Sequence, residues 1–143
     1  MILEHLLYGI NVLKIIGDLN VAVLDIHFDS RKINTGSLFV AIKGGVSDGH
    51  AHIEEAILSG AKVIVLEDMP SSLDISVTYI QVLNSKDVLA LIAANFYNKP
   101  SERIKLIGVT GTNGKTTVVN LLYDLFNLLG IKVGMLSTIN NKI

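Results

Sequence analysis

A glycine-rich run separates an apolar segment from an amphipathic segment, and it constrains the fold more than any other feature of the chain. Residues 108–117 read GVTGTNGKTT. The apolar residues 106–110 have the pattern of a buried strand, and residues 114–129 carry apolar side chains at helical spacing before Gly130. A strand that leads into a helix through such a run is the setting of a phosphate-binding loop. With a further strand over 133–137, the pattern predicts a βαβ unit with parallel pairing.

The residue types of this run suit phosphate chemistry. Glycines let the backbone curl so that N–H groups point at phosphate oxygens, and the helix that follows adds its positive end. Lys115 is expected to reach the β- and γ-phosphates of ATP as the catalytic residue, and Thr116 to offer a hydroxyl to Mg²⁺. The predicted ATP-binding residues are Gly111, Thr112, Asn113, Gly114, Lys115, Thr116 and Thr117.

Two alternatives stay open for this loop. The strict pattern requires a glycine where Val109 stands, so the spacing is a variant. A glycine-rich turn with a solvated lysine would share most of these residues. Asn113 could contact phosphate or could simply be a left-handed turn residue.

The chain also lacks parts that a complete phosphoryl-transfer site needs. Such a site takes a carboxylate from a later strand to help hold Mg²⁺, whereas the acidic residue after Thr117 is Asp124, in the middle of the predicted helix. A doubly wound sheet needs more strands than one βαβ unit supplies. We therefore expect a fragment of a larger ATP-using enzyme.

The N-terminal region predicts a small α/β domain of its own. Strands are expected over 12–16, 21–28, 37–42, 62–66 and 77–82, with helices over 2–8, 53–61 and 84–96. Pro100 follows the last helix and bars its continuation. The expected domains are therefore 1–99 and 100–143, the second incomplete.

Composition excludes several classes of protein. The 143 residues carry a formal net charge of -1, which gives no electrostatic case for nucleic-acid or membrane partners. No cysteine is present, so disulfide frameworks and thiolate metal sites are excluded. No apolar stretch is long enough to span a bilayer, and residues 1–8 lack the pattern of a signal peptide. We expect a cytoplasmic protein.

The sequence resembles a known family at several separate places. TGTNGKTT over 110–117 is similar to the ATP-binding signature of the Mur ligases, the ATP-dependent amide-bond ligases of peptidoglycan precursor synthesis. DSR over 29–31, GSLFVAI over 36–42 and DGH over 48–50 resemble the first domain of the third ligase in that series, the MurE type. The similarity runs from about residue 26 to 138. The MurF type shares DSR and DGH, and folylpolyglutamate synthetases share the TGTNGK stretch.

This resemblance implies a reaction and a set of partners. ATP would phosphorylate the terminal carboxylate of UDP-MurNAc-L-Ala-D-Glu, and a diamino acid, meso-diaminopimelate or L-lysine, would attack the acyl phosphate. Ser30, Gly45, Val46, Ser47 and Thr138 match positions that hold the UDP substrate in the family. The isolated chain is expected to be inactive. A non-catalytic nucleotide-binding module, a MurF-type fragment and another P-loop kinase or GTPase are the alternatives.

Two pairs of polar residues have competing interpretations. Asp29 and Arg31 could bind ligand or could form an ion pair that fixes a loop. His50 and His52 suggest a metal site, but residues two apart on a helix point to different faces, so a structural role is favoured.

Overall fold

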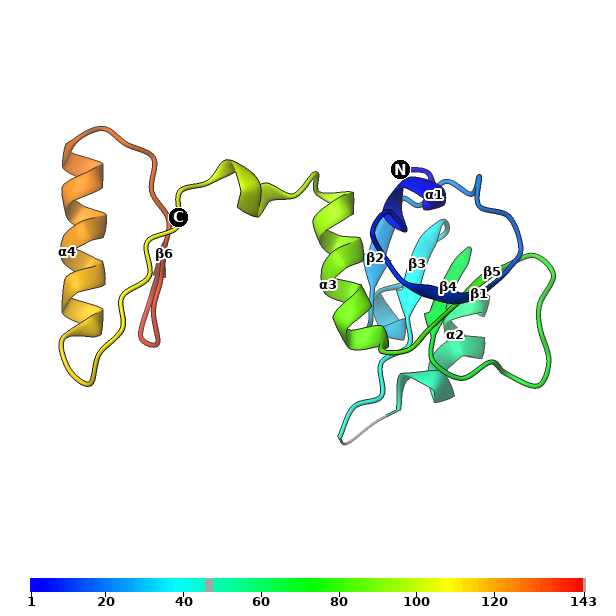
Figure 1. The fold of residues 1–143 in the computed structure, drawn as a ribbon. Coiled ribbons are helices and arrows are strands. Elements are labelled where there is room, and N and C mark those ends of the chain that lie inside the picture. Colours follow the sequence, from blue (N-terminus) through cyan, green and yellow to red (C-terminus); the bar gives the residue numbers. More distant parts are fainter. Residues whose placement is uncertain (46–47, 143) are drawn as a thin grey trace. The chain divides into compact units, whose positions relative to one another are not determined.

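The chain folds as two compact units, Met1–Arg103 and Ile104–Ile143. Both are seen in a computed structural model that describes residues 1–45 and 48–142 (Figure 1). The 3₁₀-helix η3 (Pro100–Arg103) ends the first unit, directly after the boundary expected at residue 99. No helix in the described residues combines the length and the apolar character that a membrane crossing needs.

A mixed five-stranded sheet organises the first unit. Its order is β1 (Val12–Ile16), β5 (Thr78–Val82), β4 (Val63–Leu66), β3 (Ser37–Val40) and β2 (Asp25–His27). Strands β2 to β5 run parallel, and β1 pairs antiparallel with β5. Strands β3 (SLFV) and β4 (VIVL) are buried along their whole length, as strands covered on both faces require. The predicted α/β class is confirmed.

Helices cover both faces of this sheet. On one face α1 (Leu3–Leu6) and α3 (Ser85–Phe96) pack against alternate strand residues such as Leu38, Val65 and Ile80. On the other face α2 (Ile53–Leu58) packs against the residues between them, including Phe39 and Ile64. The period of two along each strand thus supplies two separate cores. Two 3₁₀-helices, η1 (Ser30–Lys32) and η2 (Gly49–His52), lie in the connections.

The strand expected over 21–28 is shorter in the structure. Only Asp25–His27 joins the sheet, because the residues before it bond to the N-terminal segment instead. The amide of Leu3 donates to the carbonyl of Val21, and the amide of Val23 donates to the carbonyl of Met1. The other strands and helices predicted for this unit are present with small changes at their ends.

The second unit differs from its prediction. The helix is present as α4 (Lys115–Leu128), but residues 106–110 form no strand. The expected strand over 133–137 is reduced to β6 (Met135–Leu136), which pairs antiparallel with β7 (Asn141–Lys142). A strand needs a neighbour for its N–H and C=O groups, and Leu106 is 88% exposed with none beside it in the described residues. The predicted parallel βαβ pairing is therefore not formed here.

Candidate functional site

The glycine-rich run forms a curled loop that enters α4. Gly111 has φ +147° and Gly114 has φ +78°, values that L side chains rarely adopt. Gly114 is the N-cap of α4, and its carbonyl accepts from the amide of Val118 to close the first turn. The N–H groups of that turn have no intrahelical partner, and the helix dipole adds positive potential where they point. Such a loop can bind an anion through its backbone.

The Lys115 side chain folds back over this loop. Its ammonium donates to the carbonyl oxygens of Gly111 and of Thr112, the second at 3.2 Å. The predicted ATP-binding residues therefore occupy one continuous loop and first helical turn. The Lys115 ammonium is held by carbonyls of the same loop, and a phosphate oxygen bound there could replace them as its partner.

The predicted magnesium ligand, Thr116, and the predicted substrate residue, Thr138, also lie in the second unit. Thr116 is half-buried in the first turn of α4, and its carbonyl accepts from the Asn120 amide at 2.8 Å. Thr138 is exposed in the bend between β6 and β7, and the hydrogen bonds within residues 104–142 do not tie it to the loop.

A second group of predicted residues lies in the first unit, at the carboxyl ends of its parallel strands. Ser30 follows β2, and Gly45 follows β3. In open α/β sheets this edge is where ligands bind. Gly45 is exposed, and a Cβ there would meet nothing within 4 Å. Val46 and Ser47, which were also predicted to hold the UDP substrate, lie outside the described residues.

Ser30 is held by a contact from the neighbouring helix. It is only 7% exposed, and its hydroxyl donates to Oε2 of Glu55 on α2 at 2.8 Å. The same carboxylate oxygen lies 3.2 Å from Nδ1 of His52. The hydroxyl of Ser30 is therefore already oriented by protein, with its oxygen still able to accept one more hydrogen bond.

The two charged residues beside Ser30 form an ion pair. Nε and Nη2 of Arg31 each donate to one carboxylate oxygen of Asp29, at 2.8 Å. This paired hydrogen bonding from Arg31 lowers the pKa of Asp29 to about 2. Asp29 and Arg31 thus form the ion pair of the second interpretation, which fixes the loop.

A polar network that the sequence did not predict joins the loops after β3 and β4. Nε2 of His50 accepts from the amides of Glu67 at 3.0 Å and Asp68 at 3.3 Å. With Nε2 used as an acceptor, Nδ1 carries the proton and donates to Asp48 at 2.7 Å. His50 therefore has the structural role that was favoured, and His52 faces a different partner.

Lysine and carboxylate side chains extend the same network. Nζ of Lys43 lies 2.6 Å from Asp68 and 3.3 Å from Glu67. Hydrogen bonding to these carboxylates, Asp68 first, raises the pKa of Lys43. Glu67 also accepts from the Ser85 amide and hydroxyl, each at 3.0 Å, and the Ser85 amide is the largest cause of its lowered pKa. These residues are far apart in sequence, and only the strand register brings them together.

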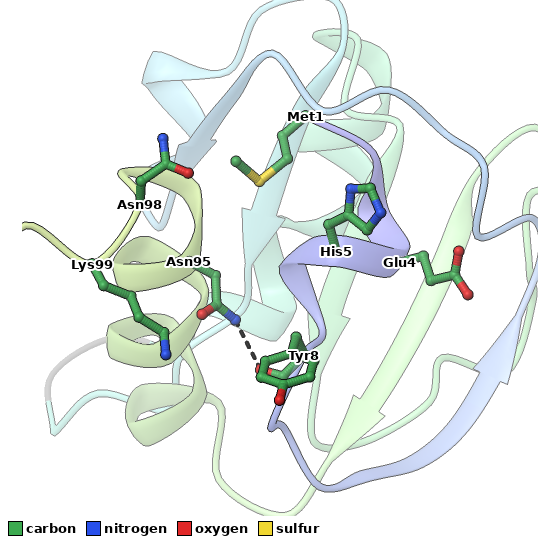
Figure 2. A pocket seen from close by; sticks show the side chains of 7 residues that line it. All are labelled: Met1, Glu4, His5, Tyr8, Asn95, Asn98 and Lys99. Carbon is green, nitrogen blue, oxygen red and sulfur yellow. Dashed lines mark hydrogen bonds between the residues drawn. The ribbon is translucent and has the colours of Figure 1, made fainter.

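A pocket of about 650 Å³ opens elsewhere in the first unit, between α1 and the end of α3. Figure 2 shows its lining, with the Asn95 amide reaching the carbonyl of Tyr8 at 2.9 Å. The lining residues are Met1, Glu4, His5, Tyr8, Asn95, Asn98 and Lys99. None of them is a predicted site residue, so this pocket is distinct from the carboxyl edge.

Curated relatives of this chain include ligases that share one name. The chain is 46% identical, over its full length, to UDP-N-acetylmuramoyl-L-alanyl-D-glutamate--2,6-diaminopimelate ligase of Phocaeicola vulgatus, and covers 30% of that protein. It is 48% identical to the enzyme of the same name from Cytophaga hutchinsonii, again over the full chain and 30% of the relative. The chain thus spans about 30% of the length of these relatives.

A solved structure and a family model agree with these relatives. The MurF ligase of Thermotoga maritima in complex with ADP matches with a TM-score of 0.53 and 32% identity, over 79% of this chain and 25% of that one. The model described as "Mur ligase family, catalytic domain" matches residues 25–97, from β2 to the end of α3. The match covers strands β2 to β5 and the connections between them, and the chain belongs to the Mur ligase family.

Proposed function

We propose that this chain supplies the UDP-substrate domain and the phosphate loop of a MurE-type ligase. The full protein would join 2,6-diaminopimelate to UDP-MurNAc-L-Ala-D-Glu at the expense of ATP. The named relatives at 46% and 48% identity support this choice over the MurF type, of which one solved example is 32% identical. Residues 1–99 would hold the substrate, and 100–143 would begin the ATP-binding domain.

The phosphate loop is the observation on which the proposal mainly rests. Gly111 and Gly114 give the curl its left-handed turns, and Lys115 lies over its carbonyls. In the proposed reaction the terminal phosphoryl group of ATP passes to the substrate carboxylate, which forms an acyl phosphate and ADP. The diamino acid's amine then attacks the carbonyl carbon, and phosphate leaves. Lys115 would stabilise the negative charge on the transferring group.

Thr116 is the residue of this chain that would hold Mg²⁺. A hydroxyl in the first helical turn is a suitable ligand, but Mg²⁺ prefers six oxygens. Asp124 lies about two turns further along α4, so it does not complete the set. Phosphate oxygens, water and residues outside this chain would supply the rest. When bound, the ion would neutralise charge between the β- and γ-phosphates.

At the carboxyl edge, Ser30 together with Gly45, Val46 and Ser47 would hold the UDP part of the substrate. Loop N–H groups and a pre-oriented hydroxyl are suitable partners for a diphosphate. Thr138 would approach the muramoyl side in the full enzyme, on the basis of the family resemblance alone. The protein would work in the cytoplasm, where these nucleotide precursors are made.

Calorimetry on the 143-residue chain tests the nucleotide part. ADP should bind the wild type, and Lys115→Ala should weaken binding at least about tenfold, since it removes a charge-assisted hydrogen bond. Lys105→Ala, in the same unit, is the matched control and should bind ADP normally. No binding by the folded wild type, or equal losses in both variants, would contradict the assignment.

A separate titration tests the substrate part. We expect UDP-MurNAc-L-Ala-D-Glu to shift amide NMR signals of η1 and of the residues after β3, and Ser30→Ala to weaken that binding. Ser72→Ala, in the loop before β5, is the control. Shifts confined to the pocket of Figure 2 would place the substrate elsewhere.

A further inference from the structure

We propose that Asn113 is a site of spontaneous deamidation, which converts the phosphate loop into a form with an added negative charge. Asn113 is followed by Gly114, and no other asparagine of the chain precedes a glycine. Glycine has no side chain to block approach of its own amide nitrogen to the preceding side chain. Asparagine is among the chemically labile residues of proteins.

The local structure leaves the reacting groups accessible. Asn113 and Gly114 are both exposed, and a Cβ built on Gly114 would meet nothing within 4 Å. Within residues 104–142, no hydrogen bond restrains the Asn113 side chain or the Gly114 amide. Several other asparagines are held: Asn84 accepts from two amides, and Asn95 donates to two carbonyls.

The electrostatics of the loop favour the first step. The Gly114 nitrogen must lose its proton to act as a nucleophile. It lies at the positive end of α4, next in sequence to the Lys115 ammonium, and both stabilise a developing anion. The nitrogen attacks Cγ of Asn113, a C–N bond forms, and the Cγ–Nδ2 bond breaks. The amide nitrogen leaves as ammonia, with the proton lost from Gly114.

Water completes the reaction. It opens the cyclic imide at either carbonyl, to give aspartate or isoaspartate, and no oxidant or reductant is needed. The new carboxylate suits a helix N-terminus, so α4 is not expected to unfold. It stands, however, where phosphate would bind, and isoaspartate also lengthens the backbone of the curl. Modification should therefore reduce anion binding without loss of the fold. Only this last consequence rests on the proposed function.

Trypsin provides a direct measurement. Cleavage after Lys105 and Lys115 yields peptide 106–115, in which Asn113 is the one asparagine, and peptide 63–86 contains Asn84 alone. The 143-residue chain is incubated in warm, mildly alkaline buffer, and both peptides are followed by mass spectrometry. We expect peptide 106–115 to gain the mass of the amide-to-acid exchange much faster than peptide 63–86. Equal rates, or no conversion at Asn113, would overturn the proposal.

Two further arms separate this inference from the proposed function. Asn113→Gln should abolish conversion of peptide 106–115, and persistent conversion would contradict the chemistry. Asn113→Asp should keep the circular dichroism of the wild type and lose at least about tenfold in ADP affinity, since like charges are brought together. If fresh wild type binds ADP but Asn113 stays intact, the inference fails and the proposed function stands. If Asn113 converts but no form of the chain binds ADP, the inference stands and the proposed function fails.

Discussion

Replacement of His50 by alanine should loosen the carboxyl edge of the sheet, and the structure indicates by how much. The ring accepts from the amides of Glu67 and Asp68, the first part-buried and the second exposed. Water can take the place of the ring at the exposed amide. At the part-buried amide the donor is left without a partner, which costs about 1–3 kcal/mol. We expect the free energy of unfolding of the first unit to fall by about 2 kcal/mol.

His52→Ala is the matched control for this prediction. Its ring is exposed and meets Glu55 at 3.2 Å on the surface of the same unit. Loss of an exposed contact of this kind costs about 0.5 kcal/mol or less.

Hydrogen exchange of the β4 amides measures both variants in the first unit alone, because these buried amides exchange only when the unit opens. Exchange in His50→Ala should be about 30-fold faster than in the wild type, the factor that 2 kcal/mol represents. If both histidine variants exchange at the same rate, or if His50→Ala matches the wild type, then the contacts of the His50 ring contribute nothing to stability and the reasoning is refuted.

Two further predictions concern the first unit. Gly60 has φ +107°, and a Cβ there would lie 2.8 Å from Cα of Thr35, whereas Gly9 has φ +75° and open space. The overlap at residue 60 should cost about 1–3 kcal/mol of folding free energy. Gly60→Ala should therefore lower the urea midpoint of unfolding more than Gly9→Ala does, and equal midpoints would contradict this. Because the pKa of Asp29 falls to about 2 in the folded state, its stabilisation is present above about pH 4 and is lost as the pH drops toward 2. Arg31→Gln should flatten the stability profile in that window, and an unchanged profile would show that the pair does not act on folding.

Local signals in the sequence predicted most of the first unit. The strand predicted over 62–66 forms as β4 (Val63–Leu66) and is buried on both faces, and Asn84 caps α3 by accepting from two amides. These features depend on neighbouring residues, which a sequence displays. The network of Lys43, His50 and Glu67 depends on the parallel register of β3 and β4, which no local pattern contains.

In the second unit, local sequence predicted a strand that the structure does not form. Residues 106–110 have the composition of a strand, but a strand exists only with a partner, and none lies beside it in the described residues. The loop itself was predictable, since left-handed turns at Gly111 and Gly114 follow from glycine alone. The back-folded position of the Lys115 side chain was not, because a lysine stem has many rotamers and its choice depends on the carbonyls around it.

That back-folded lysine would make the proposed phosphate binding at this loop an exchange of one set of partners for another. The ammonium already has two carbonyl partners, Gly111 and Thr112, so an arriving polyphosphate must compete with them for the charge. The affinity gained through Lys115 would then be the difference between its interaction with phosphate and its interaction with the two carbonyls. That difference is smaller than the gain from a lysine that has no partner before binding. Longer chains of phosphates, which offer more oxygens to the same cation, should profit from this competition more than a monophosphate does.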